Sequence, residues 1–268
     1  MNNSKKSKLI SVLLWVLLIV FLMILLYSGY RIFDYYYEKH TAESTYEDVI
    51  SRFRKEESEQ PPTESKRDDE PTDGTEEPAL FFPERVDTAA IAAEYEDFRG
   101  WLYCPDTVID YPVMQGADNE KYLHHLIDGS YNYNGCLFID FRCSSDFSDR
   151  NTVIYGHNMR SGIMFGTLQQ YKKAEYYEEH PVLYLQTAEK KYCLEVVSAY
   201  TTRHDSKGYG SFNDDTAYLE YLEEIRDYAA FDSPVELDLS SKIVTLSTCA
   251  YEFDNARFLV VCKLTEIK

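Results

Sequence analysis

The chain has 268 residues, enough for one sizeable domain with additional segments, and its six cysteines include no Cys-x-x-Cys pair. The formal net charge is -19 at pH 7, which argues against a nucleic-acid partner because nucleic-acid binding needs a basic surface. The usual zinc-ligand spacing is missing, and we expect neither a metal nor another cofactor.

An apolar segment from Leu9 to Tyr27 lies near the start of the chain. As a helix it would be about 28 Å long, close to the ~30 Å hydrocarbon core of a bilayer. Three lysines precede it and its other flank is mixed, so the positive-inside rule places the N-terminus in the cytoplasm. A cleaved signal peptide is the alternative, but its apolar core is normally shorter and precedes small residues. We expect a cytoplasmic tail over residues 1–8, a transmembrane anchor over 9–29 and the remaining chain outside the cell membrane.

Residues 30–78 are expected to connect this anchor to a folded domain. The first part, to Lys55, could continue as a helix, and its tyrosines suit the interfacial aromatic belt. Glu56 to Pro78 is rich in Glu, Asp, Pro, Ser and Thr, so it cannot bury enough apolar surface to fold and is predicted to be a disordered spacer. An acidic partner-binding or calcium-binding tail is the functional alternative, although no EF-hand spacing is present.

The folded domain is expected over residues 79–268. A helix is predicted from Asp87 to Trp101, with Asp87 as N-cap and apolar residues on one face. A second short helix is predicted from Asn119 to Ile127. It contains His124 and His125, which point in different directions on a helix and so cannot chelate one metal as an i, i+4 pair would. We interpret them as packing or surface histidines.

The middle of the domain alternates between predicted strands and helices. Four segments have strand patterns: Gly135–Phe141, Thr152–Tyr155, Val182–Gln186 and Lys191–Thr201. Two segments have helical patterns: Ile163–Tyr171 and Asn213–Ala230, the second with Asn213 or Asp214 as its N-cap. His157 falls just past the end of a strand, in a loop where Gly156 allows a tight change of direction.

A strand from Lys242 to Cys249 is predicted by its β-branched and apolar residues. Its alternate side chains Val244, Leu246 and Thr248 suit a core, whereas the other face is half polar and ends in the thiol of Cys249. A further strand from Arg257 to Leu264 follows a turn, and the resulting hairpin would bring Arg257 back near Cys249. Such a pair could be a nucleophile with an anion stabiliser, although a structural cysteine is the simpler interpretation of this thiol taken alone.

The other five cysteines are an odd number for a complete disulfide framework. Cys262 shares a strand face with apolar residues and is predicted to be part of the core. Cys136 and Cys143 could pair, and the sequence leaves this open.

Three motifs, in the chain order His157, Cys249, Arg257, resemble those of the sortases, cysteine transpeptidases of the Gram-positive cell surface. Thr245-Leu-Ser-Thr-Cys249 matches the sortase TLxTC motif, and Arg257 matches the arginine that begins the last barrel strand of the family. Tyr155-Gly-His-Asn-Met159 matches the histidine motif in the form typical of class B. The helix predicted at 213–230 is also similar to class B. The resemblance covers about residues 87–264.

The resemblance implies a mainly β fold with peripheral helices: a closed barrel of about eight strands, N-terminal helices and a helix before the cysteine strand. It also implies a reaction on secreted proteins that carry an LPXTG-like or NPQTN-like sorting signal. Cys249 would attack the carbonyl that follows threonine and form a thioacyl enzyme. An amine, from a peptidoglycan precursor or a pilin lysine, would then resolve this intermediate.

The residue types suit the implied roles. His157 is expected to be a general acid and base, whereas Arg257 stays protonated and can only donate hydrogen bonds to an oxyanion or to the substrate backbone. The N–H of Ala250 is a candidate second oxyanion donor. Asn158 and Ser247 are candidate substrate-binding residues, and a simple strand-surface serine is the alternative for Ser247.

Two other interpretations are weaker. In papain-like cell-wall peptidases the cysteine precedes the histidine, whereas here His157 precedes Cys249. A catalytically inactive, membrane-tethered binding module would not need the full set of three residues. No carboxylate is assigned to orient His157, because position 251 is tyrosine where some class B relatives carry an acid, and only Glu252 and Asp254 lie nearby.

Overall fold

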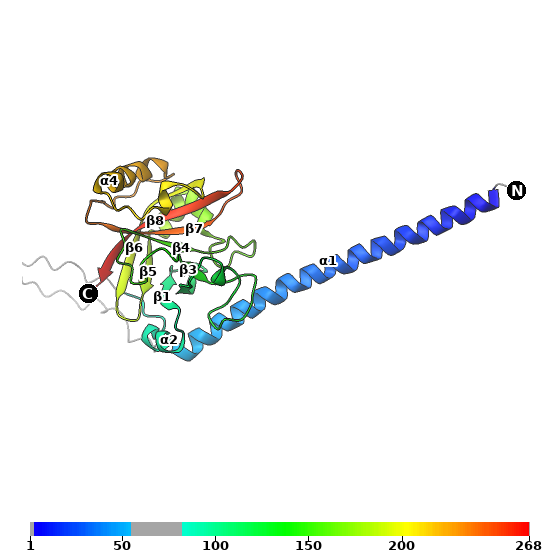
Figure 1. Ribbon diagram of the computed structural model, residues 1–268, viewed down its shortest axis with the longest axis horizontal. Coiled ribbons are helices and arrows are strands. Elements are labelled where there is room, and N and C mark those ends of the chain that lie inside the picture. Colours follow the sequence, from blue (N-terminus) through cyan, green and yellow to red (C-terminus); the bar gives the residue numbers. More distant parts are fainter. Residues whose placement is uncertain (1–2, 55–81, 268) are drawn as a thin grey trace, which may run out of the picture. The chain divides into compact units, whose positions relative to one another are not determined.

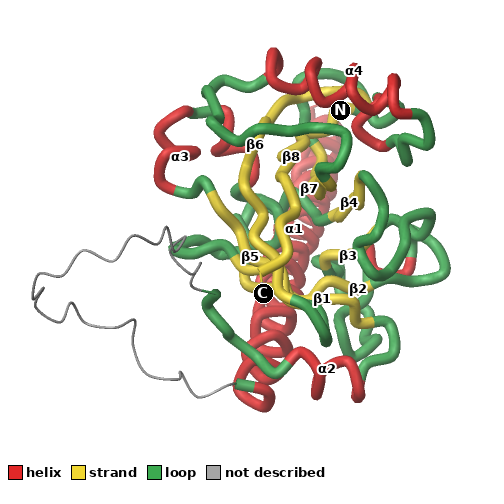
Figure 2. Tube along the Cα trace, turned by 90° about the vertical axis from the view of Figure 1, so that its left-hand side faces the viewer, coloured by secondary structure: helices red, strands yellow, loops and turns green. Residues whose placement is uncertain are grey.

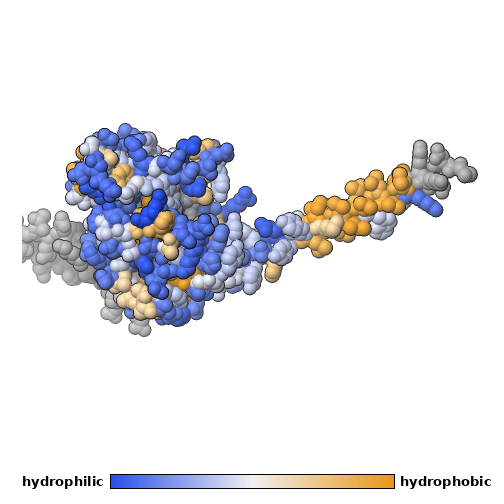
Figure 3. Space-filling model, viewed as in Figure 1, coloured by the Kyte–Doolittle hydropathy of each residue, from blue (hydrophilic) through white to orange (hydrophobic). Residues whose placement is uncertain are grey.

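The computed structural model describes residues 3–54 and 82–267, which form two compact units divided after Ser44. The predicted spacer at 56–78 lies outside the described residues. Helix α1 (Asn3–Phe53) confirms that the N-terminal helix continues beyond the apolar segment. The helix is long and apolar enough to cross a membrane, and its large apolar side chains between Leu9 and Phe33 are exposed, as Figure 3 shows in orange. The residues of α1 from Thr45 onward belong to the second unit.

Eight strands form a closed barrel in the second unit (Figures 1 and 2). They are β1 (Phe98–Tyr103), β2 (Asp110–Met114), β3 (Leu137–Ile139), β4 (Asn151–Tyr155), β5 (Val182–Gln186), β6 (Lys191–Arg203), β7 (Lys242–Cys249) and β8 (Ala256–Ile267). Their order around the barrel is β1-β2-β3-β4-β7-β8-β6-β5. The β2–β3 and β4–β7 pairs are parallel, and the other pairs are antiparallel. The predicted barrel is confirmed.

Short helices surround the barrel. The α-helices are α2 (Thr88–Glu94), α3 (Ala174–Glu179) and α4 (Asp215–Glu224), and the 3-10 helices are η1 (Lys121–Leu123), η2 (Leu168–Lys172), η3 (Lys207–Tyr209) and η4 (Ile225–Tyr228). Helix α4, the predicted helix before the cysteine strand, packs Tyr218, Tyr221 and Leu222 against outward-facing residues of β6, β7 and β8. Apolar side chains therefore fill the space under α4 as well as the barrel interior.

Several predicted helices were too long. Asp87 does cap α2, since its carboxylate accepts from the N–H of Ala90 at 3.1 Å, but the helix ends at Glu94. Residues from Phe98 to Trp101 instead pair with β2, because sheet pairing outweighs their helical spacing. The predicted helix at 119–127 is reduced to the single turn η1, after which the chain folds back on itself.

The other two helix predictions also need correction. The segment 163–171 is helical only from Leu168, because Met164 has a left-handed backbone with φ of 54°. The predicted helix at 213–230 is divided into α4 and η4. Asp214 caps α4, since its carboxylate accepts from the N–H of Ala217 at 2.9 Å.

The cysteine strand β7 has the predicted bounds but is buried on both faces. Its half-polar face is covered by α4 and η3, which sequence patterning did not indicate. The polar groups on this face have partners: the Thr245 hydroxyl donates to Asn151 Oδ1 at 2.8 Å, and Ser247 bonds to the Tyr209 hydroxyl at 2.8 Å. Buried polar groups are tolerated where such bonds are made.

All six cysteines are free thiols, so Cys136 and Cys143 do not pair. Cys136 contacts the Tyr46 hydroxyl at 3.3 Å, and Cys143 lies 3.8 Å from the carbonyl of Asn151. Cys262 is fully buried, which confirms its predicted place in the core.

Candidate active site

The ends of β4 and β7 place His157 beside Cys249. The two strands are parallel, and Tyr155 of β4 pairs with Ser247 of β7. The pairing continues past the end of β4, since Gly156 N–H donates to the Ser247 carbonyl at 3.1 Å. His157 follows Gly156, Cys249 ends β7 two residues after Ser247, and Asn158 Nδ2 donates to the Cys249 carbonyl at 2.7 Å, so the loop that carries His157 lies beside the end of β7.

Arg257 lies on the other side of Cys249. These two residues form the last register pair of the β7–β8 hairpin. Directly opposite residues of an antiparallel pair project from the same face of the sheet. The predicted hairpin is therefore confirmed: Arg257 lies directly opposite Cys249, and β7 runs beside both β4 and β8 (Figure 1).

The imidazole of His157 is oriented by a backbone carbonyl. Its Nε2 lies 2.8 Å from the oxygen of Leu123, and because a carbonyl can only accept, Nε2 carries the proton. In the neutral ring Nδ1 is then the basic atom. The rings of His124 and Tyr133 pack nearly parallel to it, with centroids at 5.8 and 6.0 Å. His124 is thus a packing histidine, as predicted, but its partner is His157.

Burial lowers the pKa of His157 below its ordinary value. The hydrogen bond to Leu123 acts in the opposite direction, and the neighbouring His124 lowers the pKa further. The neutral ring should therefore persist to a pH below 6.5, the ordinary value. We expect NMR titration of the His157 ring protons to give a midpoint below 6.5. A midpoint above 6.5 would contradict this and indicate an ion pair with a Cys249 thiolate.

The carbonyl of Cys249 is held by two side-chain amides. Asn158 Nδ2 donates to it at 2.7 Å, and Gln169 Nε2 donates at 3.2 Å. Gln169 also accepts from Lys172 Nζ at 2.8 Å, and Lys172 forms an ion pair with Glu252 in the β7–β8 loop. Asn158, which we predicted to bind substrate, thus contacts the nucleophile's own backbone. Gln169 was missed, because no local pattern marks a contact 80 residues away.

We expect Gln169→Ala to lower kcat about fivefold and to leave KM unchanged. The bond that it removes is of the kind worth about 1 kcal/mol, and it fixes the backbone of the nucleophile rather than the substrate. Steady-state kinetics on a sorting peptide would measure both constants. Gln170→Ala is the matched control, because Gln170 is exposed and adjacent in sequence. Equal effects of the two substitutions would contradict a positioning role for Gln169.

The other two predicted binding residues are engaged within the protein. The N–H of Ala250 donates to the carbonyl of Ala256 at 3.0 Å, which argues against its predicted role as a free oxyanion donor. Ser247 is 1% exposed and bonded to Tyr209, so it is not a strand-surface serine. Its predicted place in a substrate groove would require Tyr209 to move.

Tyr209 lies close to the candidate residues and was not predicted. Burial raises its pKa, the bond to Ser247 and the charge of Arg257 act in the opposite direction, and Cys249 raises the pKa further. Asn151 holds the segment that carries Tyr209, since its Nδ2 donates to the carbonyls of Gly208 at 2.9 Å and Gly210 at 3.1 Å. Tyr209 therefore has a fixed position over Ser247.

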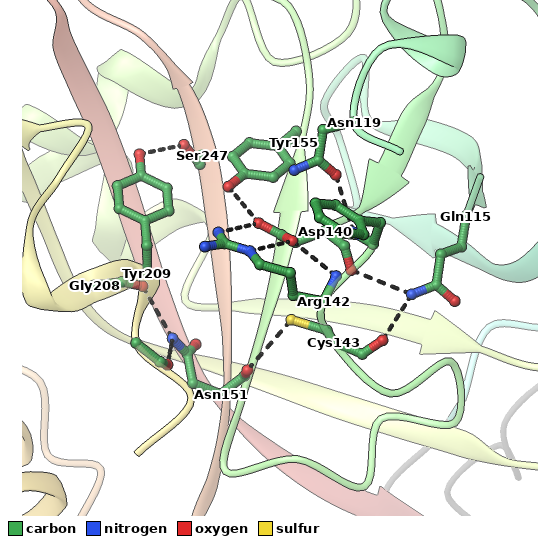
Figure 4. A network of polar contacts seen from close by, with 12 residues as sticks. Gln115, Asn119, Asp140, Arg142, Cys143, Asn151, Tyr155, Gly208, Tyr209 and Ser247 are labelled. Atoms are coloured by element: carbon green, nitrogen blue, oxygen red, sulfur yellow. Dashed lines mark hydrogen bonds and ion pairs between the residues drawn. The ribbon is translucent and has the colours of Figure 1, made fainter. Parts of the chain in front are cut away.

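A buried carboxylate, that of Asp140, is part of a network of polar contacts that includes Tyr155 of β4 (Figure 4). Asp140 is 1% exposed and accepts from Arg142 Nε at 2.9 Å, Arg142 Nη2 at 2.7 Å and the Tyr155 hydroxyl at 2.8 Å. Burial alone would raise the pKa of Asp140, but these bonds outweigh it and the pKa lies below its ordinary value. The Tyr155 ring stacks on Tyr209 with centroids 6.1 Å apart. This network holds the end of β4 next to η3.

Within residues 3–54 and 82–267, no group of three or more His, Cys, Asp or Glu side chains is arranged to hold a metal ion. The chemistry available at this site is that of a thiol, an imidazole and a guanidinium. That combination suits covalent acyl transfer through a thioester.

Comparisons with known proteins agree with this geometry. A family model described as a sortase domain matches residues 102–265, a range that contains all three candidate residues. Sortase B from Listeria monocytogenes is 34% identical over 172 residues, which cover 63% of this chain and 70% of that protein.

Solved structures agree as well. A Staphylococcus aureus sortase B–substrate complex is 30% identical with a TM-score of 0.64, covering 68% of this chain and 85% of that one. A Bacillus anthracis protein described as similar to sortase B has a TM-score of 0.66 at 28% identity, covering 88% of this chain and 99% of that one. The chain therefore belongs to class B of the sortase family, the cysteine transpeptidases whose barrel it shares.

Proposed function

We propose that the protein is a membrane-anchored transpeptidase that cleaves a C-terminal sorting signal after threonine and transfers the protein to a cell-wall or pilin amine. The observation that supports this proposal is that Cys249 and Arg257 are cross-strand partners and that Asn158, the neighbour of His157, bonds to the Cys249 carbonyl. We infer that a nucleophile, a proton carrier and a cation act together there.

In the first step the thiol of Cys249 gives its proton to the neutral His157 ring, and the resulting thiolate attacks the carbonyl carbon after threonine. The thiolate is the reactive form, and a free thiol near pKa ~8.5 is only partly ionised at neutral pH. Arg257 donates hydrogen bonds to the developing oxyanion. The C–N bond then breaks, the leaving amine takes a proton from His157, and a thioester between Cys249 and the threonine carbonyl remains.

In the second step an acceptor amine attacks the thioester. His157 takes a proton from this amine, the C–S bond breaks, and Cys249 is released as a thiolate. One related structure is a sortase B complexed with triglycine, so a glycine peptide is a reasonable first acceptor to test. A peptidoglycan precursor or a pilin lysine would supply the same chemical group.

The proposed topology follows from α1. Residues 1–8 form the cytoplasmic tail, 9–29 cross the membrane, 30–78 form the juxtamembrane helix and spacer, and 79–268 form the extracytoplasmic catalytic domain. The exposed apolar surface of α1 supports the crossing, since such a surface is stable in a hydrocarbon core and costly in water.

The proposal is tested with the full chain in detergent micelles. The protein is incubated with a peptide library that includes LPXTG-like and NPQTN-like signals, with triglycine as acceptor, and the products are read by mass spectrometry. We expect cleavage after threonine and a product joined to triglycine. Binding of a signal peptide without cleavage would support an inactive binding module, and cleavage at other positions would contradict the sorting assignment.

A further inference from the structure

Tyr46 joins the end of α1 to the barrel. It lies in the same compact unit as the barrel and is 4% exposed. Its hydroxyl donates to the carbonyl of Gly135 at 2.6 Å and lies 3.3 Å from Cys136 Sγ. Its ring meets that of Tyr111 edge-on, with centroids 5.3 Å apart. A buried hydroxyl aimed at one backbone carbonyl fixes that carbonyl more firmly than ring packing alone.

Gly135 in turn is packed directly against the backbone that carries the Leu123 carbonyl. Its φ is 58°, and a Cβ at this position would lie 2.5 Å from the Leu123 oxygen and 2.3 Å from the Tyr122 oxygen. The two segments are also hydrogen-bonded, since the N–H of Cys136 donates to the Tyr122 carbonyl at 2.9 Å. A displacement of Gly135 must therefore move Leu123, because no side chain lies between them to absorb it.

The Leu123 carbonyl is the group that accepts from His157 Nε2. The two rings that pack on His157, those of His124 and Tyr133, come from the same segment of residues 121–136. The orientation of the imidazole thus depends on the position of this segment, and the segment is attached to α1 at Gly135.

We propose that Tyr46 is a positioning residue for His157. Its hydroxyl fixes the Gly135 carbonyl, the close contact of Gly135 fixes Leu123, and the Leu123 carbonyl sets the imidazole. The proposal rests on the proposed function for its kinetic consequences. On this proposal, the end of helix α1 helps to hold His157, the general acid and base, in its position.

The test is Tyr46→Phe in the full chain, which keeps the ring and removes the hydroxyl. We expect kcat on the sorting peptide to fall about three- to tenfold with KM within about twofold of wild type, as for the loss of one buried hydrogen bond. We also expect the Nε2 proton of His157, seen by NMR, to exchange faster with water, because its acceptor is no longer fixed. A loss of packing elsewhere would not change this signal.

Tyr218→Phe is the matched control. Tyr218 is also buried, and its hydroxyl donates to the carbonyls of Ser241 at 2.7 Å and Arg150 at 3.2 Å, at the opposite ends of β7 and β4. We expect this substitution to lower Tm but to leave kcat and the His157 signal unchanged. Cys136→Ala, which keeps the Tyr46–Gly135 bond, should also leave both readouts near wild type.

The outcomes distinguish a failure of the positioning proposal for Tyr46 from a failure of the proposed function. If Tyr46→Phe lowers only Tm, as Tyr218→Phe does, Tyr46 has a structural role and the positioning proposal is overturned. If the wild-type protein cleaves no sorting peptide, the proposed function fails, and the exchange rate of the His157 Nε2 proton still decides whether Tyr46 positions the ring.

Discussion

Cys249→Ala should abolish cleavage of the sorting peptide and leave the barrel folded. The substitution removes the atom that forms the thioester, and loss of a nucleophile typically costs more than about 10³-fold in turnover. The side chain is only half-buried at the end of β7, so we expect the free energy of unfolding to change by less than about 1 kcal/mol. Peptide cleavage and urea unfolding of the same preparation measure the two effects.

The other cysteines provide the control for this prediction. Cys104 is 1% exposed and burial raises its pKa to about 11, and burial raises the pKa of Cys136 to about 12. A methanethiosulfonate reagent should therefore modify Cys249 much faster than either of them. If Cys104 reacts as fast as Cys249, or if Cys249→Ala still cleaves the peptide, thiol catalysis at this position is wrong.

Arg257→Lys should lower turnover by about 10²-fold, within the range found when one oxyanion donor is removed. Lysine keeps the positive charge but lacks the planar guanidinium, so it cannot direct two N–H groups at one carbonyl oxygen. The guanidinium also donates to its own strand, from Nη1 to the Ala256 carbonyl at 3.0 Å, and this contact is lost as well. The measurement is kcat/KM with the sorting peptide at fixed ionic strength.

Arg203→Lys is a suitable comparison for Arg257→Lys. Arg203 pairs with Ala256 across β6 and β8, so it lies one position from Arg257 on the same rim, but its side chain is 65% exposed and pairs with Asp205. We expect this variant to retain wild-type kinetics. Wild-type turnover in Arg257→Lys would show that the position contributes charge alone.

Local patterns predicted the strands of the site well and the helices poorly. The bounds of β5 and β7 match the prediction, because β-branched and apolar residues fill them and turn residues flank them. The segment at 119–127 was misassigned, because its course depends on distant contacts, such as the Asn119 side chain that accepts from the N–H of Phe141 at 2.9 Å. Spacing within one segment carries no information about such partners.

The candidate site also contains residues that the sequence predicted and supporting residues that it did not. His157, Cys249 and Arg257 were predicted because their motifs resemble those of the sortases, whereas strand patterns alone left Cys249 as a structural cysteine. The residues that support them act through the backbone: Gln169 holds a carbonyl of β7, and Leu123 presents a carbonyl to His157. A backbone carbonyl is present at every position, so the sequence does not distinguish the one that is used.

The β7–β8 loop is closed at its base by the bond from the Ala250 N–H to the Ala256 carbonyl. At its tip, Tyr251 is 78% exposed and Phe253 is 45% exposed. Randomising these two tip positions should therefore leave the geometry of the hairpin base intact. The tip is therefore a place where the exposed surface beside Cys249 and Arg257 can be varied while the pairing of these two residues is kept.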